Sequence, residues 1–239
     1  MNAGASIADN LTKVHAGIQA AARRAGRAPT EIALMAVTKT VPPERIRQAH
    51  AAGLRLFGEN RVQEFASKID QLRDLQQTSW HMIGHLQSNK AGKAVELFTG
   101  VDSLDSLKLA EKLNAAAEEA GKRLPVLVEL NLGGEESKSG LRPGSPEIDR
   151  LLHAAPHLSS LEILGLMTLP PFTEDPQGAR QYFRQLRELR DQIAARNLPS
   201  VSMDTLSMGM SHDFEVAIEE GSTCVRLGTG IFGPRPVPR

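Results

Sequence analysis

Short apolar runs alternate with longer amphipathic segments along almost the whole chain, and this alternation restricts the fold more than any other feature. Each run has the length of a strand, whereas each longer segment repeats its apolar residues with a helical period. The runs are 31–38, 54–58, 80–84, 98–102, 124–132, 161–167, 203–206 and 223–227. The helical segments are 43–52, 60–75, 88–96, 104–120, 145–155, 176–196 and 213–220. Because parallel neighbours need a crossover connection, this order predicts a parallel sheet.

Eight parallel strands are the number that closes a TIM barrel, so we predict an α/β fold with a single (β/α)8 barrel. An open doubly wound sheet is the alternative. We assign all 239 residues to one domain, with an N-terminal helix at 5–25, the barrel at 31–233 and a tail at 234–239. The tail GPRPVPR is unsuited to a helix, so we expect no helix after the last strand. The extra N-terminal helix is expected to take that place in the outer ring.

Charge and cysteine content exclude several classes of partner. Lysine plus arginine (28) equals aspartate plus glutamate (28), so the chain lacks the basic excess typical of nucleic-acid-binding proteins. The single cysteine, Cys224, excludes an internal disulfide and fits a reducing compartment. We find no apolar stretch long enough to span a membrane and no signal-peptide core, so we expect no membrane partner and a cytoplasmic location.

Lys39 is the first candidate for chemistry. The active site of a TIM barrel lies at the C-terminal ends of its strands, and Lys39 closes the first apolar run in the sequence AVTK. Uncharged neighbours can lower the pKa of a lysine and make it a nucleophile for a carbonyl group. The alternative is a strand-end lysine whose ammonium group reaches solvent.

Glycine and hydroxyl residues after the last two strands predict an anion site. The segment 228–233 matches G-x-G-x-x-G, but only six residues follow it, so it fails as a dinucleotide fingerprint. TIM barrels often bind phosphate after strands seven and eight. Ser207 and Gly209, Gly228 and Thr229, and a helix start near Asp213 are suited to this task. The alternative is a pair of glycine turns that only close the barrel.

Three other features have simpler interpretations. His81 and His85 lie four residues apart, but no cysteine or carboxylate pair is near them in sequence, so we predict no metal site. Cys224 lies inside an apolar strand and is interpreted as a buried small hydrophobe. Met208 and Met210 fit either the core or contact with a flat ring at the barrel end.

Six segments together resemble one known family. They are AVTK ending at Lys39, GENRVQE (58–64), WHMIGHLQSNK (80–90), GEESKSGL (134–141), LSMGMSHDFEVAI (206–218) and VRLGTGIFG (225–233). In this order and spacing they resemble the YggS/PROSC family of proteins that bind pyridoxal 5′-phosphate (PLP) and act in PLP homeostasis.

The resemblance implies a barrel like the N-terminal domain of alanine racemase, with PLP bound to Lys39 as an internal aldimine. Ser207, Gly228 and Thr229 would hold the phosphate, and Arg226 would face the pyridine nitrogen. The pocket would be lined by Asn60, His85 and Met208 or Met210.

The sequence favours a carrier over an enzyme. Two-base racemisation needs a second base opposite Lys39, which in the racemases is a tyrosine from a second domain. The only tyrosine here, Tyr182, lies in the middle of a helical segment, and the chain ends soon after the last strand. We therefore expect a monomeric PLP carrier or regulator without robust catalysis, with PLP-dependent apo-enzymes as candidate recipients. A PLP-dependent racemase or related enzyme is the alternative, and a barrel for another phosphate ligand is a third possibility.

Overall fold

The eight apolar runs form eight parallel strands that close into a barrel in sequence order, β1-β2-β3-β4-β5-β6-β7-β8. The computed structural model describes residues 6–135 and 138–234. The strands are β1 (Ala33–Val37), β2 (Leu56–Glu59), β3 (Ser79–Met82), β4 (Gly100–Leu104), β5 (Leu124–Leu130), β6 (Leu161–Thr168), β7 (Val201–Ser207) and β8 (Cys224–Leu227). The first and last strands pair from Ala33↔Cys224 to Ala36↔Leu227. This pairing confirms the predicted barrel and excludes the open sheet.

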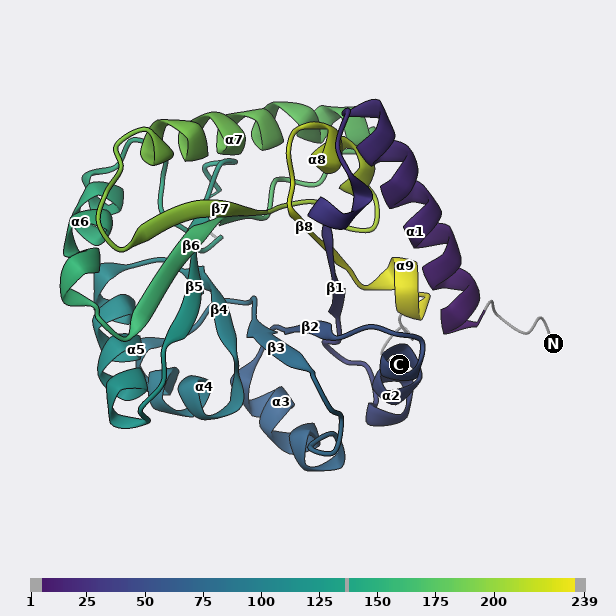
Figure 1. Cartoon of the computed structure of the whole chain (residues 1–239), viewed down its shortest axis with the longest axis horizontal. Helices are drawn as coiled ribbons and strands as arrows, with labels where there is room; N and C mark the ends of the chain where they lie inside the picture. Colours follow the sequence, from purple (N-terminus) through teal and green to yellow (C-terminus); the bar gives the residue numbers. More distant parts are fainter. Residues whose placement is uncertain (1–5, 136–137, 235–239) are drawn as a thin grey trace.

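Helices surround the barrel in a ring (Figure 1). The α-helices are α1 (Ile7–Arg24), α2 (Pro43–Ala51), α3 (Val62–Lys68), α4 (Ala91–Leu97), α5 (Leu107–Glu119), α6 (Pro146–Ala154), α7 (Arg180–Ala194), α8 (Phe214–Glu219) and α9 (Thr229–Phe232). Short 3-10 turns are η1 (Pro29–Glu31), η2 (Ile69–Gln71), η3 (Ser88–Lys90), η4 (Ala155–His157) and η5 (Pro176–Ala179). The prediction of no helix after the last strand is wrong, because α9 follows β8 before the proline-rich segment begins. Most of the predicted tail, 235–239, lies outside the described residues.

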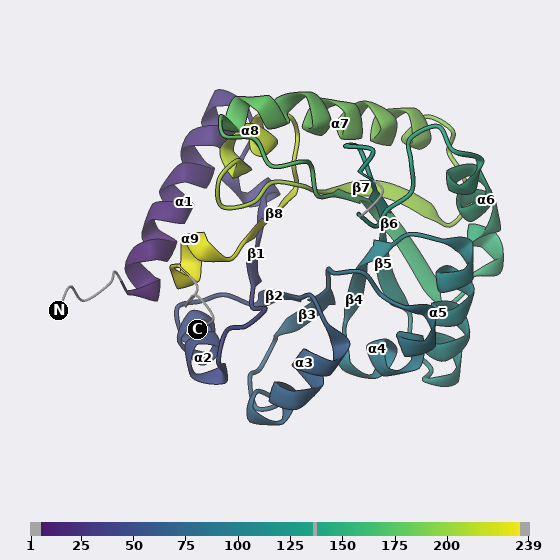
Figure 2. The same ribbon diagram turned by 180° about the vertical axis from the view of Figure 1, so that it is seen from behind.

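Helix α1 takes the expected place in the outer ring. Ser6 caps its N-terminus through a capping box with Asp9, and Arg23 and Arg24 lie in its last turn. Its apolar face packs against α8 and α9, and the view from behind shows the same neighbours (Figure 2). The amide of Asn10 donates a hydrogen bond to the carbonyl of Ile231 at 2.9 Å. Helix α1 therefore covers the seam where β8 meets β1.

Two separate apolar cores hold the barrel. The large one fills the layer between the strands and the ring of helices. The small one consists of Met35, Ile83 and Cys224, of which Met35 and Cys224 also line a pocket of about 500 Å³; we call this cluster the interior plug. Gly58 packs closely against it, since a Cβ at this position would lie 2.7 Å from the sulfur of Met35 and would push that side chain aside. Burial raises the pKa of the Cys224 thiol to about 12, so this cysteine packs as a small hydrophobe, as predicted.

Within the described residues, none of the helices is both long and apolar enough to cross a membrane.

Candidate functional site

A small pocket at the C-terminal ends of the strands, which we call the mouth of the barrel, brings together four of the predicted site residues. Its volume is about 70 Å³. It is lined by Val37, Lys39, Asn60, Ile83, Leu169, Met210 and Arg226. Lys39 follows β1, Asn60 follows β2, and Arg226 lies in β8. Ile83, a member of the interior plug, lines it as well, so the pocket borders the interior plug.

Arg226 is held rigidly in the lumen. Its side chain is buried, and its Nη1 donates to Ser207 Oγ at 2.5 Å while its Nη2 donates to the carbonyl of Thr168 at 2.7 Å. Burial lowers the pKa of the Arg226 guanidinium below its ordinary value. A guanidinium nevertheless has only donors to offer. Ser207 therefore points into the lumen and supports Arg226.

The segments after β7 and β8 are joined by hydrogen bonds. The amide of Arg226 donates to the carbonyl of Gly209 at 2.9 Å, and the amide of Gly230 donates to Ser211 Oγ at 3.0 Å. Gly228 is partly buried and Thr229 is exposed beside them. The hydroxyl of Ser211, which the sequence analysis did not select, thus lies against the turn that contains Thr229. The two segments contain the residues of the predicted anion site, and Ser211 adds a hydroxyl group to them.

Met208, Met210 and Asp213 of the same segment differ in what they contact. Met208 is fully buried in the large core and is not among the residues that line the Lys39 pocket, whereas Met210 is. The carboxylate of Asp213 accepts a hydrogen bond from the Met210 amide at 2.6 Å. Burial raises the pKa of Asp213 above its ordinary value. Asp213 therefore fixes the backbone that carries Met210.

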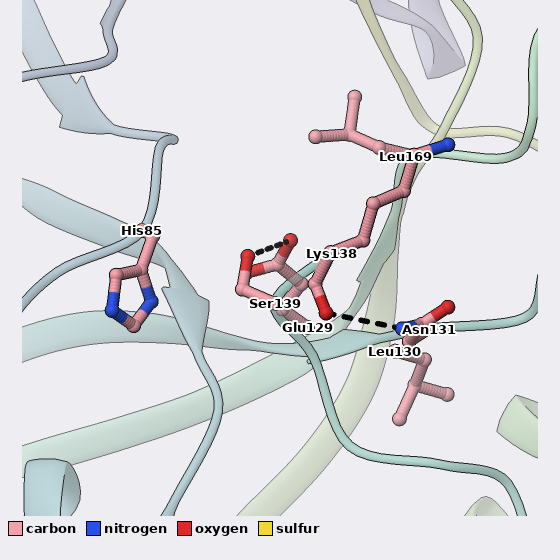
Figure 3. A pocket seen from close by; sticks show the side chains of 7 residues that line it. All are labelled: His85, Glu129, Leu130, Asn131, Lys138, Ser139 and Leu169. Atoms are coloured by element: carbon pink, nitrogen blue, oxygen red, sulfur yellow. Dashed lines mark hydrogen bonds between the residues drawn. The ribbon is translucent and has the colours of Figure 1, made fainter. Parts of the chain in front are cut away.

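A larger pocket of about 540 Å³ adjoins the Lys39 pocket and shares Leu169 with it (Figure 3). Its lining residues are His85, Glu129, Leu130, Asn131, Lys138, Ser139 and Leu169. The carboxylate of Glu129 is buried and accepts hydrogen bonds from Ser139 Oγ at 3.1 and 3.2 Å. Burial raises the pKa of Glu129 to about 7. This glutamate, which the sequence analysis also missed, holds or releases its proton near neutral pH.

His85 lies at the edge of the large pocket, on the far side from Leu169 (Figure 3). Its Nδ1 lies 3.1 Å from Asp105 Oδ2, which orients the ring. A third hollow of about 250 Å³ contains both His85 and Asn60. Since the three pockets share Leu169, Asn60 and His85 pairwise, they lie side by side across the mouth.

His81 in β3 and His85 just after this strand each lie close to a carboxylate that is distant in the sequence. His81 Nδ1 lies 2.8 Å from Asp102 Oδ1, and although burial alone would lower the pKa of His81, the Asp102 carboxylate raises it. Across residues 6–135 and 138–234, no group of three or more histidine, cysteine or acidic residues is arranged to hold a metal ion. Tyr182 lies in α7 of the outer ring and is partly buried.

Comparison with known proteins identifies the family. The family model for the N-terminal domain of alanine racemase matches residues 10–236. The pyridoxal phosphate homeostasis protein of Aquifex aeolicus is 45% identical over 227 residues, which are 95% of this chain and 97% of that protein. The chain belongs to the family of pyridoxal phosphate homeostasis proteins. A second member, from Pseudomonas aeruginosa, is 44% identical over 230 residues, which are 96% of this chain and 96% of that protein.

Solved structures that this chain resembles have the same fold. PipY from Synechococcus elongatus, in a structure with PLP bound, superposes with a TM-score of 0.81 at 36% identity, covering 95% of this chain and 100% of that one. The alanine racemase of Streptomyces coelicolor has a TM-score of 0.67 at 21% identity. The match covers 95% of this chain and 59% of the racemase, and at this identity it shows a likeness of fold alone.

Proposed function

We propose that this chain binds PLP at the mouth of the barrel, with Lys39 as the Schiff-base lysine, and serves PLP homeostasis as a carrier or regulator. The observation that carries the proposal is the pocket that brings Lys39 together with Arg226 of β8 and with Met210 of the segment after β7. The family relatives are named for PLP homeostasis, and the PipY structure has PLP bound. Both findings support PLP as the ligand of this pocket.

The residues at the mouth fit the three parts of PLP. Lys39 would hold the C4′ aldehyde end of PLP through its amine, and the aldehyde would supply reversible Schiff-base chemistry there. Arg226 would donate to the pyridine nitrogen, and Asn60 and Met210 would contact the ring. Gly228, Thr229 and the hydroxyl of Ser211 would hold the phosphate. Compared with the prediction from sequence, Ser211 replaces Ser207 in this role, because Ser207 Oγ is engaged with Arg226.

A carrier role agrees with the chemistry of these groups. Arg226 can only donate, so it would keep the pyridine nitrogen unprotonated and weaken the ring as an electron sink. Thr229 is exposed, so a phosphate held there would lie near solvent. A Schiff base is reversible in water, so the cofactor can be captured and released. PLP-dependent apo-enzymes are the proposed recipients.

The experiment that tests this proposal maps the attachment point of the cofactor. Holo-protein is reduced with borohydride, digested, and searched for the pyridoxyl-lysine peptide. We expect the pyridoxyl group on Lys39 alone, and we expect Lys39→Ala to fold normally while losing visible absorption and borohydride trapping. Lys93→Ala, at an exposed lysine of α4, is the control that keeps both signals. A pyridoxyl group on Lys90 or Lys138 of the wild-type protein contradicts the assignment.

A further inference from the structure

Two charged side chains from α3 hold both peptide groups of Lys39. The peptide group before Lys39 presents the carbonyl of Thr38, which accepts a hydrogen bond from Lys68 Nζ at 2.9 Å. The peptide group after it presents the amide of Thr40, which donates to Glu64 Oε1 at 2.6 Å. These two peptide planes set the direction in which the Cα–Cβ bond of Lys39 points. We call Lys68 and Glu64 the clamp.

The two residues of the clamp form an ion pair with each other, and Lys68 forms a second ion pair with Glu59. Lys68 and Glu64 are one helical turn apart, and their charged groups are 3.1 Å apart. Lys68 Nζ also lies 2.7 Å from Glu59 Oε1, and that oxygen accepts from Thr38 Oγ1 at 2.6 Å. The side chains of Lys68 and Glu59 are 8% and 0% exposed. The contacts of Lys68 with Glu59 and Thr38 are therefore shielded from competing water, whereas the Thr40–Glu64 hydrogen bond lies at an exposed position.

The backbone after Lys39 is strained at Thr40, and the clamp residue Glu64 maintains this conformation. Thr40 has a φ of 61°, in the left-handed region that β-branched residues rarely adopt. Such conformations persist only where surrounding contacts impose them, and they concentrate at functional sites. Here the contact that imposes it is the Thr40 amide on Glu64. A relaxed Thr40 would turn the peptide plane and with it the base of the Lys39 side chain.

From these contacts we infer that Lys68 and Glu64 are positioning residues, which aim the Lys39 amine at the PLP aldehyde without touching the cofactor. The inference rests on the proposed function and adds to it the residues that control the covalent step. A buried charged network is seldom the most stable way to fill a core, since apolar residues of similar volume often serve as well. Its value here lies in directing two specific peptide groups, which apolar side chains cannot do.

The test separates covalent capture of PLP from its non-covalent recognition. Two variants loosen the clamp: Glu64→Ala, and the charge-balanced pair Lys68→Met with Glu59→Gln, which leaves no buried carboxylate without its cation. Glu64→Gln is the conservative variant, because its amide oxygen can still accept from Thr40. Lys93→Met, at an exposed lysine of α4 paired with Glu96, is the control. Stopped-flow absorbance gives the capture rate of PLP, and titration gives the affinity for pyridoxine 5′-phosphate, which lacks the aldehyde.

We expect both loosened variants to capture PLP about tenfold more slowly, because a misplaced reactive group costs rate steeply. Their affinity for pyridoxine 5′-phosphate should stay at the wild-type value, and Glu64→Gln should recover most of the rate. Unchanged capture rates overturn the inference, and so does an equal loss of rate and affinity, which would indicate a general structural role. Trapping of wild-type protein at a lysine other than Lys39 would instead overturn the proposed function itself.

Discussion

At the scale of single residues, Thr229 offers the most direct test of the phosphate site. Its side chain is exposed beside the Ser211–Gly230 hydrogen bond, so an alanine there should not disturb the fold. A hydrogen bond to a charged group contributes roughly 1.5–3 kcal/mol. Thr229→Ala should therefore weaken PLP binding about ten- to a hundredfold. A fluorescence titration checks this, with Thr12→Ala on the exposed face of α1 as the control; an unchanged dissociation constant removes Thr229 from the site.

Glu129 should make the stability of the protein depend on pH. Its folded-state pKa is about 7, against 4.5 for an ordinary glutamate, so the folded state binds the proton more tightly than the unfolded state. The free energy of unfolding should therefore fall as the pH rises from about 4.5 to about 7, by roughly 3 kcal/mol at most.

The variant Glu129→Gln cannot ionise at this position, so it should not lose stability through this group as the pH rises. We expect the variant to be more stable than wild type at pH 8 and nearly equal to it at pH 4.5, measured by urea unfolding. Glu111→Gln, at an exposed position of α5, should leave the pH profile unchanged. A wild-type profile that is flat across this range would show that Glu129 ionises normally.

Which residues gather at the mouth was predictable, but their directions were only partly so. Lys39 was selected because the barrel rule places strand ends at one mouth, whereas Asn60 and Arg226 were assigned from the family resemblance. Ser207 and Met208 were taken for pocket residues, yet one points into the lumen and the other into the large core. The directions of these side chains depend on the residue at which β7 ends and on how the chain turns after it. The pattern of apolar residues does not predict either.

At the scale of elements, α7 and α8 are joined through one buried carboxylate. Glu220, directly after α8, lies within 3.1 Å of guanidinium nitrogens of Arg180, Arg184 and Arg187. Burial alone would raise the pKa of Glu220, but the arginines hold it below its ordinary value. The stabilisation should therefore be present above the unfolded pKa and be lost as the pH falls through the folded one.

We expect Glu220→Gln to lower the stability by about 1–3 kcal/mol at pH 7, less than for a fully buried pair because the arginines are partly exposed. The loss should shrink in acid. Glu188→Gln, at an exposed position of α7, is the control, and chemical unfolding at pH 7 and pH 4 is the measurement. A loss that is equal at both pH values would speak against an ionic role.

Element types were predicted well, whereas contacts between elements were not. All eight strands and α1 follow from apolar periodicity, but α9 was missed because its four residues are too short to show a period. The carboxylates that face His81 and His85 come from β4 and its exit, some twenty residues away in sequence. Only the pairing of β3 with β4 brings them together, so no local pattern could have assigned them.

At the scale of the whole molecule, the number of strands and their parallel order were enough to predict closure. Eight crossover-linked strands leave the first and the last as the only open edges, and pairing them satisfies both. Met35 pairs with Arg226, so the base of the pocket lies between β1 and β8, which are far apart in the sequence. What could not be predicted is the interior plug, since the packing of Met35, Ile83 and Cys224 depends on the exact stagger of the strands.

The pairing of β8 with β1 also sets the order of events when the chain folds. Until β8 joins, a growing chain carries an open parallel sheet with two unsatisfied edges, a form that is slow to complete and prone to associate with other chains. Lys39 is synthesised early and Arg226 late, and they become neighbours only when this last contact forms. Under the proposed function, ligand capture at the mouth would therefore report that the barrel has closed.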